Sequence, residues 1–173
     1  LTAGTYTAGG VSYGWRSGQL TASSPLAAGS KAFSITATDT LAHAGTQPGF
    51  SVTVDNTTPA GSDIQTTNAG TAGKAETGDT VIFTFSEPVD PNSILSGWNG
   101  SSTSVTLRLN QQNGAMGDRL MVYDAANTLQ LPLGTSRLIR DYVAADMAFT
   151  GSTMVMSGST VTIRLGTPNG ATL

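Results

Sequence analysis

The chain has 173 residues, a formal net charge of −3 and no cysteine. Eight Lys and Arg against eleven Asp and Glu leave no basic patch for phosphate groups, which argues against nucleic-acid binding. The lack of cysteine excludes disulfides, thiolate metal sites and thiol nucleophiles. Charged residues make up only 11%, whereas 18 Ser and 27 Thr supply polar surface. This composition favours an exported bacterial protein over a cytosolic enzyme.

The apolar runs are all far shorter than the roughly 20 residues that cross a bilayer, so we expect no membrane insertion. Residues 1–10 contain neither a basic region nor an apolar stretch, so we expect no signal peptide there. A mature secreted protein would already have lost such a peptide. We therefore predict an extracellular or cell-surface location.

Apolar and polar residues alternate along the chain, which predicts antiparallel strands with one buried and one exposed face. Turn-forming pairs such as Pro48-Gly49 and Asn99-Gly100 separate the alternating runs, so the fold class is all-β. In chain order, the predicted core consists of Phe33, Ile35, Phe50, Val52, Val81, Phe83, Phe85, Trp98, Val105, Leu107, Val122, Val161 and Ile163.

Helix signals are few. Asp90 is a suitable N-cap and Pro91 a suitable first residue for one helical turn that ends before Gly97. A second candidate, Ala144–Met147, is too short to predict a helix. The polar, proline-containing stretch after Val54 predicts a domain boundary, with a partial module at residues 1–57 and a full module at residues 58–173.

Four segments resemble a known family: Gly4–Thr7 (GTYT), Lys31–Asp39 (KAFSITATD), Phe50–Pro59 (FSVTVDNTTP) and Thr77–Asn92 (TGDTVIFTFSEPVDPN). The first three are similar to the closing strands of bacterial Ig-like repeat domains, and the fourth to the opening of the next repeat. Such repeats occur in large surface and secreted proteins. The resemblance implies Ig-like β-sandwich modules in tandem, with a structural or adhesive role and no catalytic residues.

The sequence offers two candidate binding sites. Asp39, Asp55 and Asn56 lie at strand ends near the module junction, where hard cations take oxygen ligands from loops. We expect these side chains to cap Asx turns, and the alternative, which the resemblance supports, is a junction calcium held by the same residues. Beyond this calcium, we expect no cofactor. Tyr13 and Trp15 lie on one side of a predicted strand and are candidates for stacking on the rings of a cell-surface glycan.

Catalysis has little support in the sequence. His43 is the one histidine and lies in a turn, which predicts a solvated loop residue. The two glutamates, Glu76 and Glu87, lie in no apolar setting that would raise a carboxyl pKa. The densest charge cluster, at residues 137–141, predicts a solvated turn. We therefore expect no catalytic residue and no enzymatic activity.

These observations favour a structural segment of a bacterial surface or filament-forming protein; the alternative is a glycan- or cell-surface-binding adhesin module. The first module has too few strands for a sandwich, and the second lacks a closing strand. We therefore expect identical copies or neighbouring repeats to be partners through sheet edges, because unpaired edges and bare apolar faces are costly.

Overall fold

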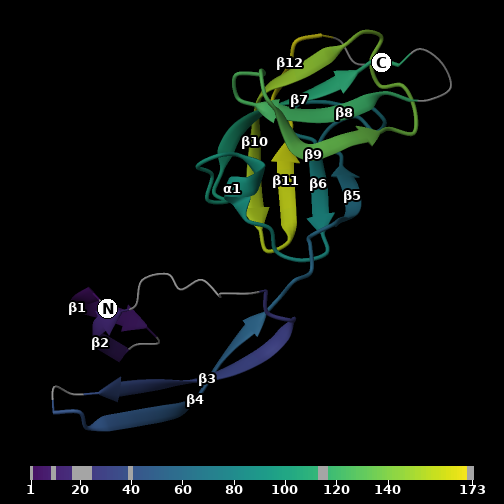
Figure 1. The fold of residues 1–173 in the computed structure, drawn as a ribbon. Helices are drawn as coiled ribbons and strands as arrows, with labels where there is room; N and C mark the ends of the chain where they lie inside the picture. The colour runs from purple at the N-terminus through teal and green to yellow at the C-terminus, as the bar shows by residue number, and fades with distance from the viewer. Residues whose placement is uncertain (1, 9–10, 17–24, 39–40, 113–116, 171–173) are drawn as a thin grey trace. The chain divides into compact units, whose positions relative to one another are not determined.

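The computed structural model describes residues 2–8, 11–16, 25–38, 41–112 and 117–170 (Figure 1). Strands make up 54% of the structure and helix 3%, and the sheets are antiparallel, which confirms the all-β prediction. The chain divides into two units, Leu1–Thr58 and Pro59–Leu173. The predicted boundary lies one residue before this division.

The first unit contains two separate hairpins. Each is a two-stranded antiparallel sheet, and in the described part of the chain its strands pair only with each other. The strands are β1 (Thr2–Ala8) with β2 (Val11–Arg16), and β3 (Gly29–Thr38) with β4 (Ala44–Val54).

The hairpin of β3 and β4 has two chemically different faces. Phe33 lies opposite Phe50, and an irregularity after this pair brings Ile35 opposite Gln47. Because side chains alternate along a strand, the register separates apolar from hydroxyl side chains. The apolar face carries Phe33, Ile35, Phe50, Val52 and Val54, and also Lys31 opposite Val52 and Gln47 opposite Ile35. The hydroxyl face carries Ser30, Ser34, Thr36, Thr46, Ser51 and Thr53, with Ala32 opposite Ser51.

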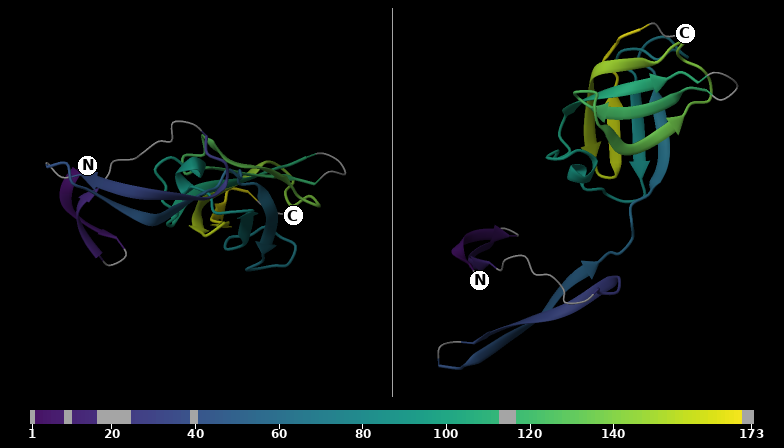
Figure 2. Two further views of the ribbon diagram at one scale, coloured as in Figure 1. Left: turned by 60° about the horizontal axis from the view of Figure 1, so that its bottom comes forward. Right: turned by 45° about the horizontal axis from the view of Figure 1, so that its top comes forward.

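The second unit is one continuous antiparallel sheet. Its strands are hydrogen-bonded in the order β5-β6-β11-β10-β7-β8-β9, and β12 pairs with β10. The sheet curls into a half-barrel around its own core, as the two further views show (Figure 2). The strands are β5 (Gly61–Thr67), β6 (Thr80–Phe85), β7 (Thr103–Asn110), β8 (Arg119–Asp124), β9 (Gln130–Arg137), β10 (Met147–Ser157), β11 (Thr160–Arg164) and β12 (Thr167–Pro168).

The bend of the sheet lies in β10. Its pairing with β7 is irregular between Phe149 and Ser152. Its opposite edge pairs with β12 at Phe149 and Thr150, and with β11 from Thr153 onward. The buried hydroxyl of Ser152 donates to the carbonyl oxygen of Phe149 (2.9 Å) and accepts from the amide of Gly166 (3.0 Å). An irregularity of this kind bends the strand, so β10 can serve two partners on one side.

The core of the second unit is built as the alternation predicts. Eight of the predicted core residues are buried, and Phe85 is half-buried against them. The buried eight are Val81, Phe83, Trp98, Val105, Leu107, Val122, Val161 and Ile163.

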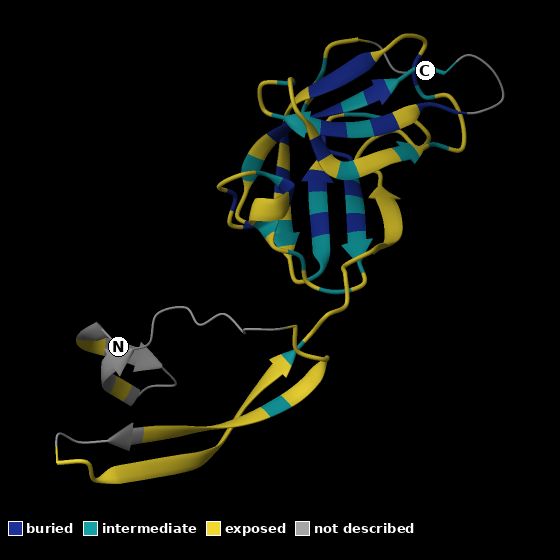
Figure 3. Cartoon of the chain, in the orientation of Figure 1, coloured by how far each residue is buried: buried dark blue, intermediate teal, exposed yellow. Residues whose placement is uncertain are grey.

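The core prediction is wrong for the first unit. Phe33, Ile35, Phe50 and Val52 are 48%, 53%, 38% and 51% exposed. Figure 3 shows the same contrast between the exposed hairpin and the buried positions of the second unit. The physical reason is that alternation selects a face of a strand, whereas burial needs a second layer, and no such layer covers this face in the described part of the chain.

The predicted helical turn is present as α1 (Pro91–Ile94). The Asp90 carboxylate accepts a hydrogen bond from the amide of Asn92 (3.0 Å), which caps the turn. Trp98 is buried, and its indole nitrogen donates to the carbonyl oxygen of Ser101 (2.5 Å). Residues 144–146 are not helical, and Met147 begins β10.

Candidate functional site

The apolar face of the β3–β4 hairpin is the first candidate for a functional surface. The rings of Phe33 and Phe50 stack with their centroids 5.4 Å apart and an interplanar angle of 23°. About half of each large side chain on this face is exposed. Full burial of such a side chain stabilises by about 1.5–3 kcal/mol. Covering the exposed halves of four side chains would therefore stabilise by about 3–6 kcal/mol in total. The four are Phe33, Ile35, Phe50 and Val52.

On the opposite face of the hairpin, hydroxyl groups suit water. The hydroxyls of Thr36 and Thr46 hydrogen-bond to each other across the two strands (2.8 Å). Cross-strand pairs of this kind stabilise the sheet by roughly 0.2–1 kcal/mol. The hairpin therefore has one face that can remain in solvent and one that is better covered.

The sheet edges of the second unit carry features that discourage pairing. On β5, one Asp63 carboxylate oxygen accepts from the amide of Ile64 (2.9 Å) and the other from the Gln65 side chain (2.9 Å). On β9, Pro132 has no amide hydrogen to donate. Charged residues and prolines on edge strands oppose strand addition. The hairpin in the first unit is thus the better candidate for contact with another chain.

The predicted calcium ligands are only partly described. Asp55 accepts a hydrogen bond from the amide of Thr57 (2.9 Å), which forms an Asx turn, and the Asn56 amide donates to the carbonyl oxygen of Leu26 (2.9 Å). Asp39 lies outside the described residues. Across the part of the chain that is described, no three His, Cys, Asp or Glu side chains are grouped so that they could hold a metal ion. The junction calcium stays a prediction.

The predicted glycan platform stays a prediction as well. Tyr13 and Trp15 belong to β2, where they lie opposite Tyr6 and Ala3. Their side chains lie outside the described part of the structure.

The other residues considered for catalysis occupy ordinary positions. His43 is exposed in the turn between β3 and β4. Glu76 and Glu87 are half-buried, and Glu76 accepts a hydrogen bond from the amide of Thr71 (2.5 Å).

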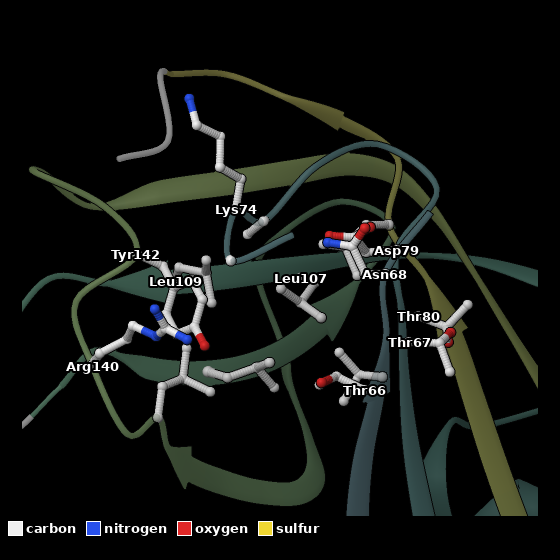
Figure 4. A pocket seen from close by; sticks show the side chains of 16 residues that line it. Thr66, Thr67, Asn68, Lys74, Asp79, Thr80, Leu107, Leu109, Arg140 and Tyr142 are labelled. Atoms are coloured by element: carbon white, nitrogen blue, oxygen red, sulfur yellow. The ribbon is translucent and has the colours of Figure 1, made fainter. Parts of the chain in front are cut away.

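A cavity that the sequence analysis missed lies within the second unit (Figure 4). Its volume is about 230 Å³. Leu107 and Leu109 of β7 lie between its two ends, and further apolar side chains come from β6, β8 and the segments after β9 and β11. These additional apolar residues are Val81, Leu120, Leu138 and Leu165.

Polar side chains surround this apolar lining. Arg140 and Tyr142 lie at one end of the cavity, and Asn68 and Asp79 at the other (Figure 4). The guanidinium carbon of Arg140 is 5.6 Å from the centroid of the Tyr142 ring, a cation–π distance. The charge cluster at residues 137–141 predicts a solvated turn. Arg140 is exposed, but it also lines the cavity.

A buried carboxylate holds the segment that carries Arg140. Asp118 is 0% exposed, and its carboxylate accepts from the amides of Tyr142 (2.5 Å), Val143 (2.9 Å) and Gln112 (3.3 Å). Its backbone also pairs with the same segment, because its amide donates to the carbonyl oxygen of Arg140 (3.3 Å). In the sequence, the pair Gly117-Asp118 predicts only an ordinary turn, so it does not show that this carboxylate is buried.

Comparison with family models, with curated proteins and with solved structures finds no match for this chain. Within the described residues, no helix combines the length and apolar character needed to cross a membrane. The function is therefore argued from the chain's own residues.

Proposed function

We propose that the chain is a non-enzymatic structural segment of a bacterial extracellular surface or filament-forming protein. In this proposal its modules are Ig-like repeats, and neighbouring repeats or identical copies cover the β3–β4 hairpin. The resemblance of the Phe50–Pro59 junction to bacterial Ig-like repeats supports this function. The hydroxyl-rich, cysteine-free composition supports the extracellular location.

The observation that carries the proposal is the exposed apolar face of the hairpin. An isolated two-stranded sheet is marginal in water, and a bare apolar face adds to its instability. Phe33 and Phe50 are stacked and partly exposed, so a second sheet laid on this face would bury both rings. A sandwich in which another repeat supplies that sheet meets this need.

The size of the face favours a tandem array over a free dimer. Two such faces meeting would gain about 6–12 kcal/mol, whereas association costs roughly 4–15 kcal/mol in lost freedom. Separate copies should therefore associate weakly. When repeats are joined in one chain, the effective concentration rises to the millimolar range and the same contact becomes favourable.

The test is the mass of the chain by light scattering from micromolar to millimolar concentration. The 17.6 kDa chain should associate with increasing concentration, and the variant F33S/F50S should stay monomeric. The matched control T36S/T46S changes the hydroxyl face of the same hairpin and should behave as wild type.

Hydrogen exchange gives a second readout. The amides of β3 and β4 should exchange rapidly in dilute solution and become protected as the chains associate. A monomer at every concentration would overturn assembly between copies. Full protection of these amides in the dilute monomer would mean that the chain covers its own hairpin, which would also contradict the proposal.

A further inference from the structure

We propose that the cavity of the second unit binds a small amphipathic carboxylate, with an aliphatic tail on the leucine lining and the carboxylate on Arg140. This inference does not rest on the structural role proposed above. It concerns a different unit, different residues and a soluble ligand.

The lining determines the chemistry of the tail. Leu107 and Leu109 form the almost fully buried floor of the cavity, and the half-buried Leu138 supplies a more accessible part of its apolar lining. The leucine-lined part of the cavity favours an aliphatic chain, because a polar ligand group without a hydrogen-bond partner would lose its hydration there. Thr66, Thr67 and Thr80 line another part of the cavity with hydroxyl groups. The cavity volume of about 230 Å³ leaves room for a short aliphatic chain.

The charge at one end determines the chemistry of the head group. No ion pair joins Arg140 to another described residue, and its guanidinium lies beside the Tyr142 ring at the end of the cavity. A planar guanidinium matches a carboxylate with two parallel hydrogen bonds. Lys74 also lines the cavity, but its amine extends away from Arg140 and Tyr142 (Figure 4).

The acidic residue at the other end does not oppose this assignment. Asp79 is buried, and its two carboxylate oxygens accept from the amides of Ala69 (2.8 Å) and Glu76 (2.9 Å). These bonds hold the loop between β5 and β6 and partly balance the carboxylate charge. Asp79 lies across Leu107 from Arg140, so the two ends of the cavity differ in charge (Figure 4).

The backbone that carries Arg140 is also held in place before any ligand binds. The buried Asp118 fixes the backbone at Arg140, Tyr142 and Val143 through the hydrogen bonds described above. A cation on a fixed backbone loses less freedom when it binds a ligand than one on a loose loop.

The experiment is a titration of the full chain with octanoate and, separately, with 1-octanol, followed by backbone amide chemical shifts. Octanoate should shift amides around Leu109, Leu138 and Arg140. R140Q should weaken octanoate binding about tenfold or more, as expected for lost hydrogen bonds to a charged group, and leave octanol unchanged. R137Q removes an exposed arginine of β9 that does not line the cavity, and should bind octanoate as wild type does.

A second variant blocks the cavity without removing the charge. L138W places a larger side chain at a half-buried position of the lining and should abolish binding of both ligands, while the remaining shifts report an intact fold. Equal affinity for octanoate and octanol in the wild type, or no effect of R140Q, would overturn the assignment. So would shifts confined to the β3–β4 hairpin.

Discussion

Replacing Asp118 with alanine tests how the cavity segment is held. The carboxylate is completely buried and accepts three backbone hydrogen bonds, from Gln112, Tyr142 and Val143. Alanine would leave these amides without their acceptor inside the protein. The shorter two bonds, to Tyr142 and Val143, are the ones whose loss we expect to dominate.

The magnitude follows from those two amides. A buried donor left unsatisfied costs about 1–3 kcal/mol, so D118A should destabilise the second unit by about 2–6 kcal/mol. D118N can keep one oxygen as the acceptor of the Tyr142 and Val143 amides and turn its amide group toward the amide of Gln112. Its cost should therefore be smaller than that of D118A.

The assay is unfolding in urea, followed by hydrogen exchange at Val105 and Val161, both fully buried in the second unit. The control D141A removes an exposed carboxylate from the same segment and should change the free energy of unfolding by less than about 0.5 kcal/mol. If D118A were as stable as D141A, the buried hydrogen bonds would not hold this segment, and the fixed position proposed for Arg140 would fail with them.

Three further predictions concern packing, pH and calcium. G166A should destabilise by about 1–3 kcal/mol in thermal unfolding, because its methyl group would overlap the backbone at Thr150, whereas G45A has open space and should be neutral. Backbone amides that donate to Asp124 hold its pKa below 3.8. The resulting stabilisation is full above pH 3.8 and lost as the pH falls through the lower folded-state pKa, so D124N should flatten the acid titration of stability. Calcium should raise the melting temperature relative to chelator if the junction site binds it, and an unchanged temperature would refute that site.

The sequence predicts the central strands of the second unit well because each turns an apolar face to the core, whereas β5 is exposed along its whole length. Val105, Leu107 and Leu109 alternate with Thr106 and Arg108, and the first three all face the core. The sequence also predicts the start of the short helix at Asp90-Pro91, because the capping contact joins residues close together in the chain. Local sequence patterns therefore predict burial correctly where the same sheet curls round to cover the apolar face of each strand.

The same reasoning fails where the outcome depends on distant contacts. Phe33 and Phe50 have the alternation of core residues, but no pattern says whether another layer covers them. The cavity was missed because its parts are far apart along the chain. Leu109 and Arg140 meet only after the sheet has curled, and the carboxylate of Asp118 becomes buried only when residues 138–143 fold over it.

The position of β11 in the sheet has a consequence for biosynthesis. β6 pairs with β11, so Phe83 lies beside Val161 only after α1 and four further strands have been made. At about 5–20 residues per second, the roughly 75 residues between β6 and β11 take about 4–15 s to synthesise. Throughout that interval β6 lacks its hydrogen-bonded neighbour β11. Strand pairing between residues so far apart in the sequence is slow. A nascent chain of this topology therefore carries an unpaired edge of β6 until residues 160–164 have been made.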